Sequence, residues 1–291
     1  MIIPARWYNG GIGLNDFRKE MIDDKRIARL IDFYNARNCF PTVEIAGGIC
    51  YFLWAKNYNG DCEIINKLDN GEEDALLRPL GEFGELIIRS NRAISIINKV
   101  LSKAEGFWDK YVSALDTFGI SSKEKGHTEY QQGDIQLLHS VGYNGQGIDY
   151  ISPNVVTKNK DLIDKYKIKI SILIPQGGES GVQPENGYRS ISGPQILPPG
   201  VVDSFSYLNV AFFDTEREAK NFLGFLTGKF ARFMMRTTFS SVHLSKNNFI
   251  FVPAMDFMQE WSDKKLYAHF DLDDKEIQLI ESTMRSIDIT I

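Results

Sequence analysis

Two short patterns in the sequence bring together residues that could do chemistry. Gly10 to Gly13 (GGIG) follows an apolar run and could wrap a phosphate, but the third glycine and the later acidic residue of nucleotide-binding loops are missing. Glu218 and Lys220, with Asp203 upstream, loosely match the groups with which a nuclease holds a metal ion. Because Glu218 and Lys220 fall between the apolar positions of a helical segment, we predict a solvated helix face there, and a tight turn at the glycines.

The histidines and cysteines show no spacing that suits a metal ion or a disulfide framework. Three cysteines are present, an odd number without a C-x-x-C pair, and the four histidines are scattered. Nothing points to a Ser–His–Asp site, although a sequence alone leaves that arrangement open. No apolar run reaches the length of a membrane span, and the first residues lack the layout of a signal peptide. We therefore assign no catalytic or metal-binding residue to this chain and expect a reduced, cytoplasmic protein.

Charged residues are unevenly distributed along the chain. The whole sequence has 33 basic and 38 acidic side chains, a net charge of −5. Residues 151–250 carry 12 basic and 8 acidic side chains (+4), whereas residues 251–291 carry 4 and 9 (−5). A DNA-facing surface needs such a local basic surplus, although solvated lysines produce one just as often. The distribution permits DNA binding without requiring it.

The first seventy residues alternate between strand-like and helix-like segments, as an α/β sheet does. Residues 1–7 form an apolar run broken at a proline, and a helical spacing of apolar residues follows the glycine loop. Residues 28–34 and 48–54 are expected to be buried strands, the second apolar on both faces. The acidic, glycine-bearing stretch 69–84 is predicted as a domain boundary.

The rest of the chain has the pattern of an α+β domain. We expect one long amphipathic helix over residues 91–115. A second helix starts at Asp214–Glu216, and its apolar face runs to Met234. Strand-like runs alternate with polar loops, and short helices near 262–269 and 273–286 close the chain. The expected strands are DIQLLHSV (134–141), IKISILIP (168–175), SYLNVAFF (206–213) and FIFVPAMDF (249–257).

An aromatic–proline pair, Phe40 and Pro41, lies in the segment NARNCFPTVEIAGGICYFLW (35–54), in a loop between the two expected buried strands. Taken alone, Phe40 would more often be a core residue. The ordered set of IIPARW (2–7), the glycine loop, a helix, LIDF and this segment is similar to the later strands of gamma-class adenine DNA methyltransferases. The closest branch is the type IIG and related single-chain restriction–modification enzymes. This resemblance implies that Phe40 stacks on an adenine flipped out of the duplex.

Later segments resemble the target-recognition domain of the same family. The resemblance implies that residues 1–75 are the C-terminal strands of a methyltransferase domain, with a partial Rossmann-like sheet, and that residues 85–291 form the DNA target-recognition domain. The implied fold class is α/β followed by α+β. The segments that carry this resemblance are IDYISPNVVTK (148–158), DLIDKYKI (161–168), YLNVAFFDTEREAKNFLGFLTGKF (207–230), VHLSKNNFIFVPAMD (242–256) and WSDKKLYAHFDLDDKEIQLI (261–280).

Two motifs of a complete enzyme of this family do not occur in the sequence: the glycine-bearing loop for S-adenosylmethionine, and the Asn-Pro-Pro-Tyr tetrapeptide that holds the adenine amino group. The resemblance therefore implies that this chain binds no cofactor and is inactive alone. S-adenosylmethionine acts in the complete enzyme, which could also carry a restriction endonuclease activity. An N-terminal methyltransferase half or a second copy is expected to complete the sheet. The open alternatives are a stand-alone, non-catalytic DNA-binding specificity subunit and a remnant without a present role.

Basic and amide side chains of the target-recognition segment are the candidates for contact with double-stranded DNA. Phosphate contacts add affinity that falls with salt, whereas reading of base edges favours Arg, Asn and Gln. For each candidate, a solvated loop residue is the alternative interpretation. The phosphate candidates are Lys158, Lys160, Lys229, Arg232, Arg236, His243 and Lys246, and the base-edge candidates are Asn144, Gln146, Gln176, Gln183 and Arg189.

Overall fold

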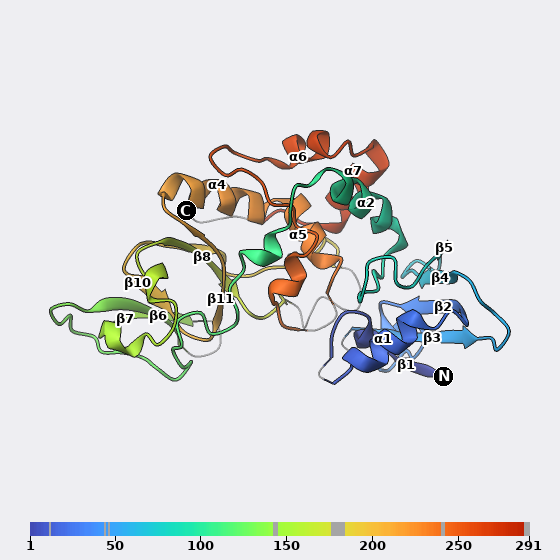
Figure 1. Ribbon diagram of the computed structural model, residues 1–291, viewed down its shortest axis with the longest axis horizontal. Coiled ribbons are helices and arrows are strands. Elements are labelled where there is room, and N and C mark those ends of the chain that lie inside the picture. Colours follow the sequence, from blue (N-terminus) through green and yellow to red (C-terminus); the bar gives the residue numbers. More distant parts are fainter. Residues whose placement is uncertain are drawn as a thin grey trace.

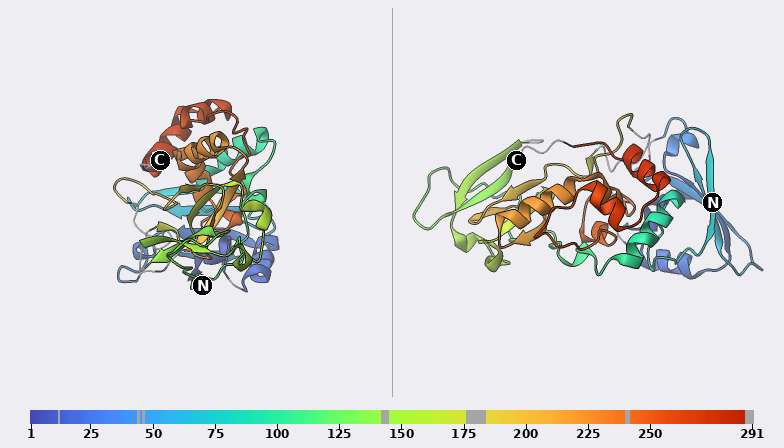
Figure 2. Two further views of the ribbon diagram at one scale, coloured as in Figure 1. Left: turned by 90° about the vertical axis from the view of Figure 1, so that its left-hand side faces the viewer. Right: turned by 90° about the horizontal axis from the view of Figure 1, so that it is seen from above.

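A computed structural model describes residues 1–11, 13–43, 45, 47–141, 145–175, 184–239 and 242–287. The molecule is elongated, with a five-stranded sheet at one end and two three-stranded sheets toward the other (Figure 1). The right-hand view of Figure 2 shows the same arrangement from above, with helices lying between the two ends. The mixed α/β composition with several sheets agrees with the predicted class.

The N-terminal sheet has β2 (Ile27–Phe33) at its centre. This strand pairs in parallel with β4 (Cys62–Lys67) and antiparallel with β3 (Ile49–Trp54), and the other neighbours are antiparallel. One face packs on α1 (Asn15–Asp23) and the 3-10 helix η1 (Ala5–Tyr8), where Trp7 and Ile22 join the core of the sheet. The two predicted strands are confirmed as β2 and β3, but β3 is buried only at Ile49 and Cys50, whereas Leu53 and Trp54 at its far end are exposed. In order across the sheet, the strands are β1 (Ile2–Pro4), β3 (Ile49–Trp54), β2 (Ile27–Phe33), β4 (Cys62–Lys67) and β5 (Glu73–Arg78).

The acidic stretch predicted as a domain boundary contains part of this sheet. β5 pairs with β4 along its whole length, with Glu73 opposite Lys67 and Arg78 opposite Cys62, and it forms an exposed edge of the sheet. The core of the sheet includes Ile87, whereas Ile88 already belongs to the larger core of the rest of the chain. The change between the two cores therefore falls just beyond the predicted boundary, because charges on an edge strand resemble those of a linker.

The long helix predicted over residues 91–115 ends early. A 3-10 turn, η3 (Asn91–Ala93), leads into α2 (Ile94–Lys103), and the backbone is extended from Ala104. Trp108 then donates its backbone N–H to Val252 and its indole N–H to Val210, both at 2.8 Å. The prediction is wrong beyond Lys103, because these tertiary hydrogen bonds replace the helical ones. Trp108 and Val112 are nevertheless buried, as the apolar stripe predicts.

Two three-stranded sheets form the far end of the molecule, and three of the four expected strands lie in them (Figure 1). The expected strand FIFVPAMDF is wrong: its first residue ends the 3-10 helix η7 (Lys246–Phe249), and Val252 donates a turn hydrogen bond to Phe249. One sheet has the order β10 (Val201–Asp203), β6 (Ile135–Val141), β7 (Gly145–Ile151), and the other has β11 (Tyr207–Phe213), β8 (Tyr166–Ser171), β9 (Gln195–Leu197).

Helices α4 (Glu216–Thr227) and α5 (Lys229–Arg236) replace the single helix expected after Asp214. Thr215 caps α4 at the predicted start. The break falls at Gly228, where an added Cβ would lie 2.7 Å from the Asp263 carboxylate, which accepts hydrogen bonds from the first two amides of α5. The predicted final helices are confirmed as α6 (Asp263–His269) and α7 (Asp274–Thr283).

The other regular elements with described bounds are single 3-10 turns. In the described part of the chain, none of the helices combines the length and apolar character needed to cross a membrane. The 3-10 turns are η2 (Ala36–Asn38), η4 (Trp108–Lys110), η5 (Pro153–Val155) and η6 (Lys160–Leu162).

Candidate functional site

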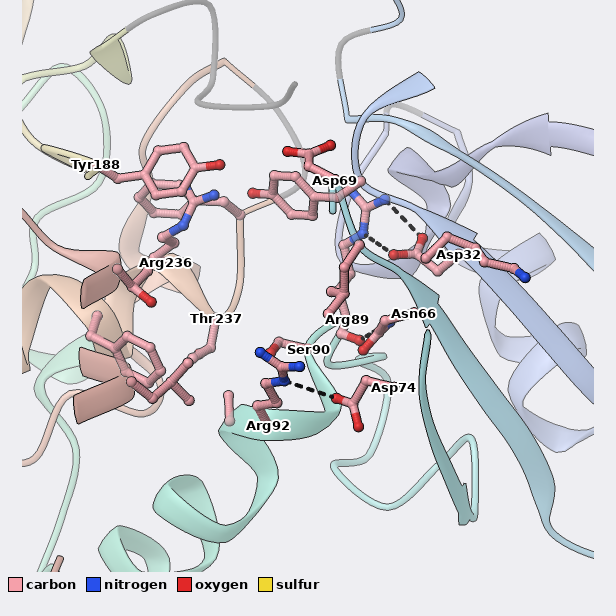
Figure 3. Close-up of a pocket in the computed structure, with 18 of the residues that line it drawn as sticks. Asp32, Asn66, Asp69, Asp74, Arg89, Ser90, Arg92, Tyr188, Arg236 and Thr237 are labelled. Atoms are coloured by element: carbon pink, nitrogen blue, oxygen red, sulfur yellow. Dashed lines mark hydrogen bonds and ion pairs between the residues drawn. The ribbon is translucent and has the colours of Figure 1, made fainter. Parts of the chain in front are cut away.

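A cleft of about 400 Å³ lies between the N-terminal sheet and the C-terminal helices (Figure 3). One wall comes from the ends of β2 and β4, with Tyr34 and residues 67–70. The opposite wall comes from Tyr188, the end of α5 and the inner side of α7. The segment 89–93, which connects the two cores, forms the floor. The cleft therefore lies where the two parts of the chain meet.

A buried ion pair organises the sheet side of the cleft. The Arg89 guanidinium donates to the Asp32 carboxylate at 2.8 and 3.1 Å, and also to the carbonyls of Phe33 and Gly47. Burial opposes the positive charge, but the neighbouring Asp32 carboxylate outweighs it and raises the pKa of Arg89. Arg89 is thus a permanently charged group with a full set of acceptors, and it holds the connecting segment to the end of β2.

Aromatic rings and guanidinium groups alternate across the cleft. The Arg89 guanidinium lies 5.5 Å from the ring centre of Tyr8 and 4.4 Å from that of Tyr34. The Arg236 guanidinium lies 5.1 Å from Tyr34 and 3.3 Å from Tyr188. In Figure 3 the Tyr188 ring lies over Arg236, on the side of the cleft opposite Arg89 and Asp32. These cation–π contacts join the sheet, the connecting segment and α5 in one row.

Phe40 lies in the loop after η2, at the same end of the sheet. Phe40 is 39% exposed, so its predicted place in a loop between β2 and β3 is confirmed and the alternative of a core residue is not. The side-chain amides of Asn35 and Asn38 donate to the Asp69 carboxylate at 3.1 and 2.9 Å. Asp69 also lines the cleft. One carboxylate therefore anchors the Phe40 loop beside the cleft.

The two patterns that suggested phosphate or metal chemistry have structural roles. Leu14 donates its N–H to Gly11 at 3.1 Å, which closes the predicted tight turn. Glu218 accepts from the Thr215 hydroxyl at the start of α4, and Lys220 pairs with Glu216 at 2.9 Å on the exposed face. The helix-face interpretation of Glu218 and Lys220 is therefore supported.

Asp203 is buried on β10 and takes part in a polar cluster at the junction of the two small sheets. Its carboxylate accepts two hydrogen bonds of 2.9 Å from the Asn209 amide. Burial raises the pKa of Asp203 to about 7 and lowers the pKa of Lys167 and of Lys169 to about 8. Lys167 donates to the carbonyls of residues 163, 165 and 198. This cluster is closed to solvent, which argues against a metal-binding role for Asp203.

Arg232 is wrong as a candidate for phosphate contact. Its side chain is 0% exposed, and its guanidinium donates to the backbone carbonyls of Thr227, Gly228, Arg189 and Arg285 at 2.7–3.1 Å. Arg232 lies on the inner face of α5 and ties three chain segments together. Helical spacing alone did not separate it from Arg236, four residues later.

The other described candidates do not form one surface. Arg236 lines the cleft, whereas Arg189 and Lys229 lie together in a second hollow, where Lys229 also pairs with Glu281 at 2.6 Å. Lys158 is exposed and pairs with Asp116 at 2.6 Å. Gln146, Lys160, His243 and Lys246 are exposed. The candidates Asn144, Gln176 and Gln183 lie outside the described residues.

Sequence reasoning missed Tyr34, Tyr188, Asp69 and Arg89. Asp32 and Arg89 are 57 residues apart, and the Asn35–Asp69 contact joins residues 34 apart. No spacing rule covers such distances, so only the unusual Arg in the apolar run 86–89 (LIIR) offered a signal.

Comparison with known proteins points to the methylases of restriction–modification systems. Residues 1–40 match the family described as Eco57I restriction-modification methylase. An "Uncharacterized adenine-specific methylase" of Mycoplasma pneumoniae (strain ATCC 29342 / M129 / Subtype 1) is 29% identical over 143 residues, covering 45% of this chain and 30% of that protein. The chain thus spans less than a third of the length of this curated relative. Together these matches support a relationship to adenine-specific restriction–modification methylases.

A solved structure, that of the type IIG restriction endonuclease BpuSI, is also similar over 97% of this chain and 47% of the other. The identity is 10% and the TM-score is 0.31. At this level the likeness carries no argument about the site.

Proposed function

We propose that this chain is the DNA-contacting, C-terminal part of a restriction–modification adenine DNA methyltransferase. In this role it recognises a specific sequence in double-stranded DNA and supports the extrusion of the target adenine. The proposal rests on one observation above all. An exposed aromatic residue, Phe40, lies in a loop that hydrogen bonds of Asn35 and Asn38 to Asp69 tie to the end of the sheet, and the first strand and helix of this sheet match the methylase family.

Phe40 is suited to receive an unpaired base because its ring is exposed while its backbone is fixed. The Phe40 N–H donates to Ala36 at 2.8 Å and its carbonyl accepts from Val43 at 2.9 Å. A ring held in this way stacks on a base at little cost in conformational entropy, and stacking leaves the base edge free for other groups. The proposed role of Phe40 is therefore to hold the extruded adenine.

S-adenosylmethionine would supply the methyl group in the complete enzyme. The glycine turn after β1 does not fit this cofactor, since an added Cβ at Gly11 would lie 2.4 Å from the Leu14 side chain, which already fills the inside of the turn. We therefore derive no step through the cofactor for the residues of this chain. Methyl transfer would require a cofactor-binding methyltransferase half supplied by a partner or by further sequence.

The test is transfer of radiolabelled methyl groups from S-adenosylmethionine to duplex DNA. We expect no label with this chain alone, and label when a methyltransferase half with the S-adenosylmethionine loop and the Asn-Pro-Pro-Tyr motif is added. Phe40→Ala should lower the transfer by about fivefold to 150-fold, because stacking of one base on an aromatic ring contributes about 1–3 kcal/mol. Phe17→Ala, which removes a ring of similar exposure on α1 (38%), should leave the transfer unchanged.

Two results would contradict the proposal. Label transferred by the chain alone would show that it is a complete enzyme. Sequence-specific DNA binding without any label in the presence of the other half would instead support a stand-alone specificity subunit.

A further inference from the structure

The cleft contains a slot between two tyrosine rings that the proposed role of Phe40 does not use. The flat guanidinium of Arg236 occupies this slot, in contact with Tyr188 at 3.3 Å and facing Tyr34 at 5.1 Å. Guanidinium groups and nucleobases stack on aromatic rings in the same way, because both are flat and polarised. The slot therefore has the geometry of a site for a flat ring.

Both rings of the slot are held in place by backbone contacts or buried charges. The Tyr188 N–H donates to Thr283 at 2.9 Å, and its carbonyl accepts from Arg285 at 3.1 Å, so the chain after α7 fixes this residue. Tyr34 packs on the Arg89 guanidinium, which the Asp32 carboxylate holds. Preorganised rings lose little freedom when a ligand binds, which favours stacking.

The polar groups around the slot suit a nucleotide. The cleft carries Asp69, whose carboxylate can accept from an exocyclic amino group, and the cations Lys67, Arg92 and Arg236. Lys67 pairs with Glu73, and Arg92 with Asp74 at 3.7 Å, so Arg236 is the candidate for a phosphate. Figure 3 shows Asp69 and Arg236 near the same level of the cleft, with Arg92 below them. A volume of about 400 Å³ lies within the range of small-molecule sites.

We propose that this slot binds a second unpaired nucleobase, stacked on Tyr34, when the Arg236 guanidinium moves aside toward the phosphate. The inference rests on the proposed function, because extrusion of one base onto Phe40 leaves at least its former partner unpaired. Phe40 does not line the cleft, so the two aromatic sites are separate. Their common element is Asp69, which lines the cleft and anchors the Phe40 loop.

The test compares binding of the full chain to a paired duplex and to the same duplex with one extra, bulged 2-aminopurine. We expect the bulged duplex to bind about tenfold more tightly, and its fluorescence to fall as the base stacks. Tyr34→Leu should abolish the preference, whereas Tyr34→Phe, which keeps the ring face, should retain it. Phe17→Leu, which removes an exposed ring outside the cleft, should also retain it.

Each outcome decides the proposal. Loss of the preference in Phe40→Leu but not in Tyr34→Leu would overturn it in favour of a single aromatic site. The slot proposal would also be overturned if the unmodified chain bound the two duplexes equally, or if the bulged base kept its fluorescence. Neither result would contradict the proposed function. Absence of binding to both duplexes at low salt would overturn both proposals. If free adenosine competes for the slot as well as the bulged duplex does, the slot binds a free nucleoside. This result would overturn the proposal that its ligand is an unpaired base of DNA.

The fluorescence measurement on the unmodified chain keeps the test valid if Tyr34→Leu fails to fold. Folding of each variant is checked by its circular dichroism spectrum, and Tyr34→Phe serves as the matched reference. The loss expected for Tyr34→Leu applies only to the preference, since the binding of the paired duplex should stay within about twofold of the unmodified chain.

Discussion

The guanidinium of Arg89 makes two hydrogen bonds to the carboxylate of Asp32, across 57 residues of sequence, and both side chains are buried. Arg89 starts the segment that leaves the sheet for the C-terminal helices, and its carbonyl accepts from the Asn66 amide at 2.8 Å. This pair therefore fixes one wall of the cleft relative to its floor.

Removal of the Asp32 carboxylate should strongly destabilise the fold. Asp32→Ala leaves a buried guanidinium without its counter-charge, and we expect a loss of about 3–5 kcal/mol in the free energy of unfolding. The measurement is equilibrium unfolding in urea. Arg29→Ala serves as the control, because it breaks the exposed pair of Arg29 with Glu63 and should cost at most about 1 kcal/mol. Equal losses in the two variants would contradict a structural role for the buried pair.

Gly48 should tolerate no side chain. Its φ is +69°, and an added Cβ would lie 2.3 Å from the Phe33 carbonyl and 2.8 Å from the Arg89 guanidinium. We expect Gly48→Ala to lower the melting temperature by well over 10 °C, because the neighbours are backbone and a fixed ion pair. Gly71→Ala isolates the cost of the positive φ, since Gly71 has a φ of +84° and open space around it. A similar small effect of both substitutions would show that the end of β2 can move.

The salt dependence of DNA binding should distinguish the exposed cations Lys158 and Lys160, which can contact phosphates, from the buried Arg232. Lys158→Gln with Lys160→Gln removes two exposed charges, and we expect the slope of log K against log salt to become shallower by about 2 if both contact phosphates. Arg232→Met should leave this slope unchanged, as measured on the fraction of the variant that folds. It should cost about 3 kcal/mol or more in stability, because four backbone carbonyls lose their donor. A flatter slope for Arg232→Met would reinstate it as a phosphate contact.

Asp203 should make the stability of the fold depend on pH. Its pKa in the folded protein is about 7, raised by burial from an ordinary value of 3.8. The folded state therefore binds the proton more tightly, and the stability from this group is complete below about pH 4 and falls as the pH rises to about 7. In Asp203→Asn this fall should be absent, so the difference in unfolding free energy between variant and unmodified chain should grow from pH 4 to 7. The check is urea unfolding across that range, and a constant difference would mean that the pKa of Asp203 is not raised.

The local elements of this protein followed largely from its sequence. Thr215 was recognisable as the start of α4, and the apolar runs of β2 and β3 predicted strands, because capping and side-chain periodicity act over a few residues. The loop position of Phe40 also followed, but its exposure did not, since an aromatic residue between two buried strands, taken alone, would more often belong to the core. The errors arose where a local pattern competed with tertiary contacts. The helix expected to run past Lys103 stops there, because Trp108 makes its hydrogen bonds with residues 252 and 210 instead.

The cleft was decided by tertiary structure alone. Tyr34, Arg236 and Tyr188 come from three distant segments, and their stacking depends on how the sheet packs on the C-terminal helices. The different environments of Arg232 and Arg236 also depend on tertiary packing. Both lie on one helix and carry the same charge, yet one binds buried carbonyls and the other lines the cleft. A sequence encodes the charge of a side chain, and a spacing of four residues places both arginines on the same side of the helix. What packs against each turn of that side decides that Arg232 is buried while Arg236 faces the cleft.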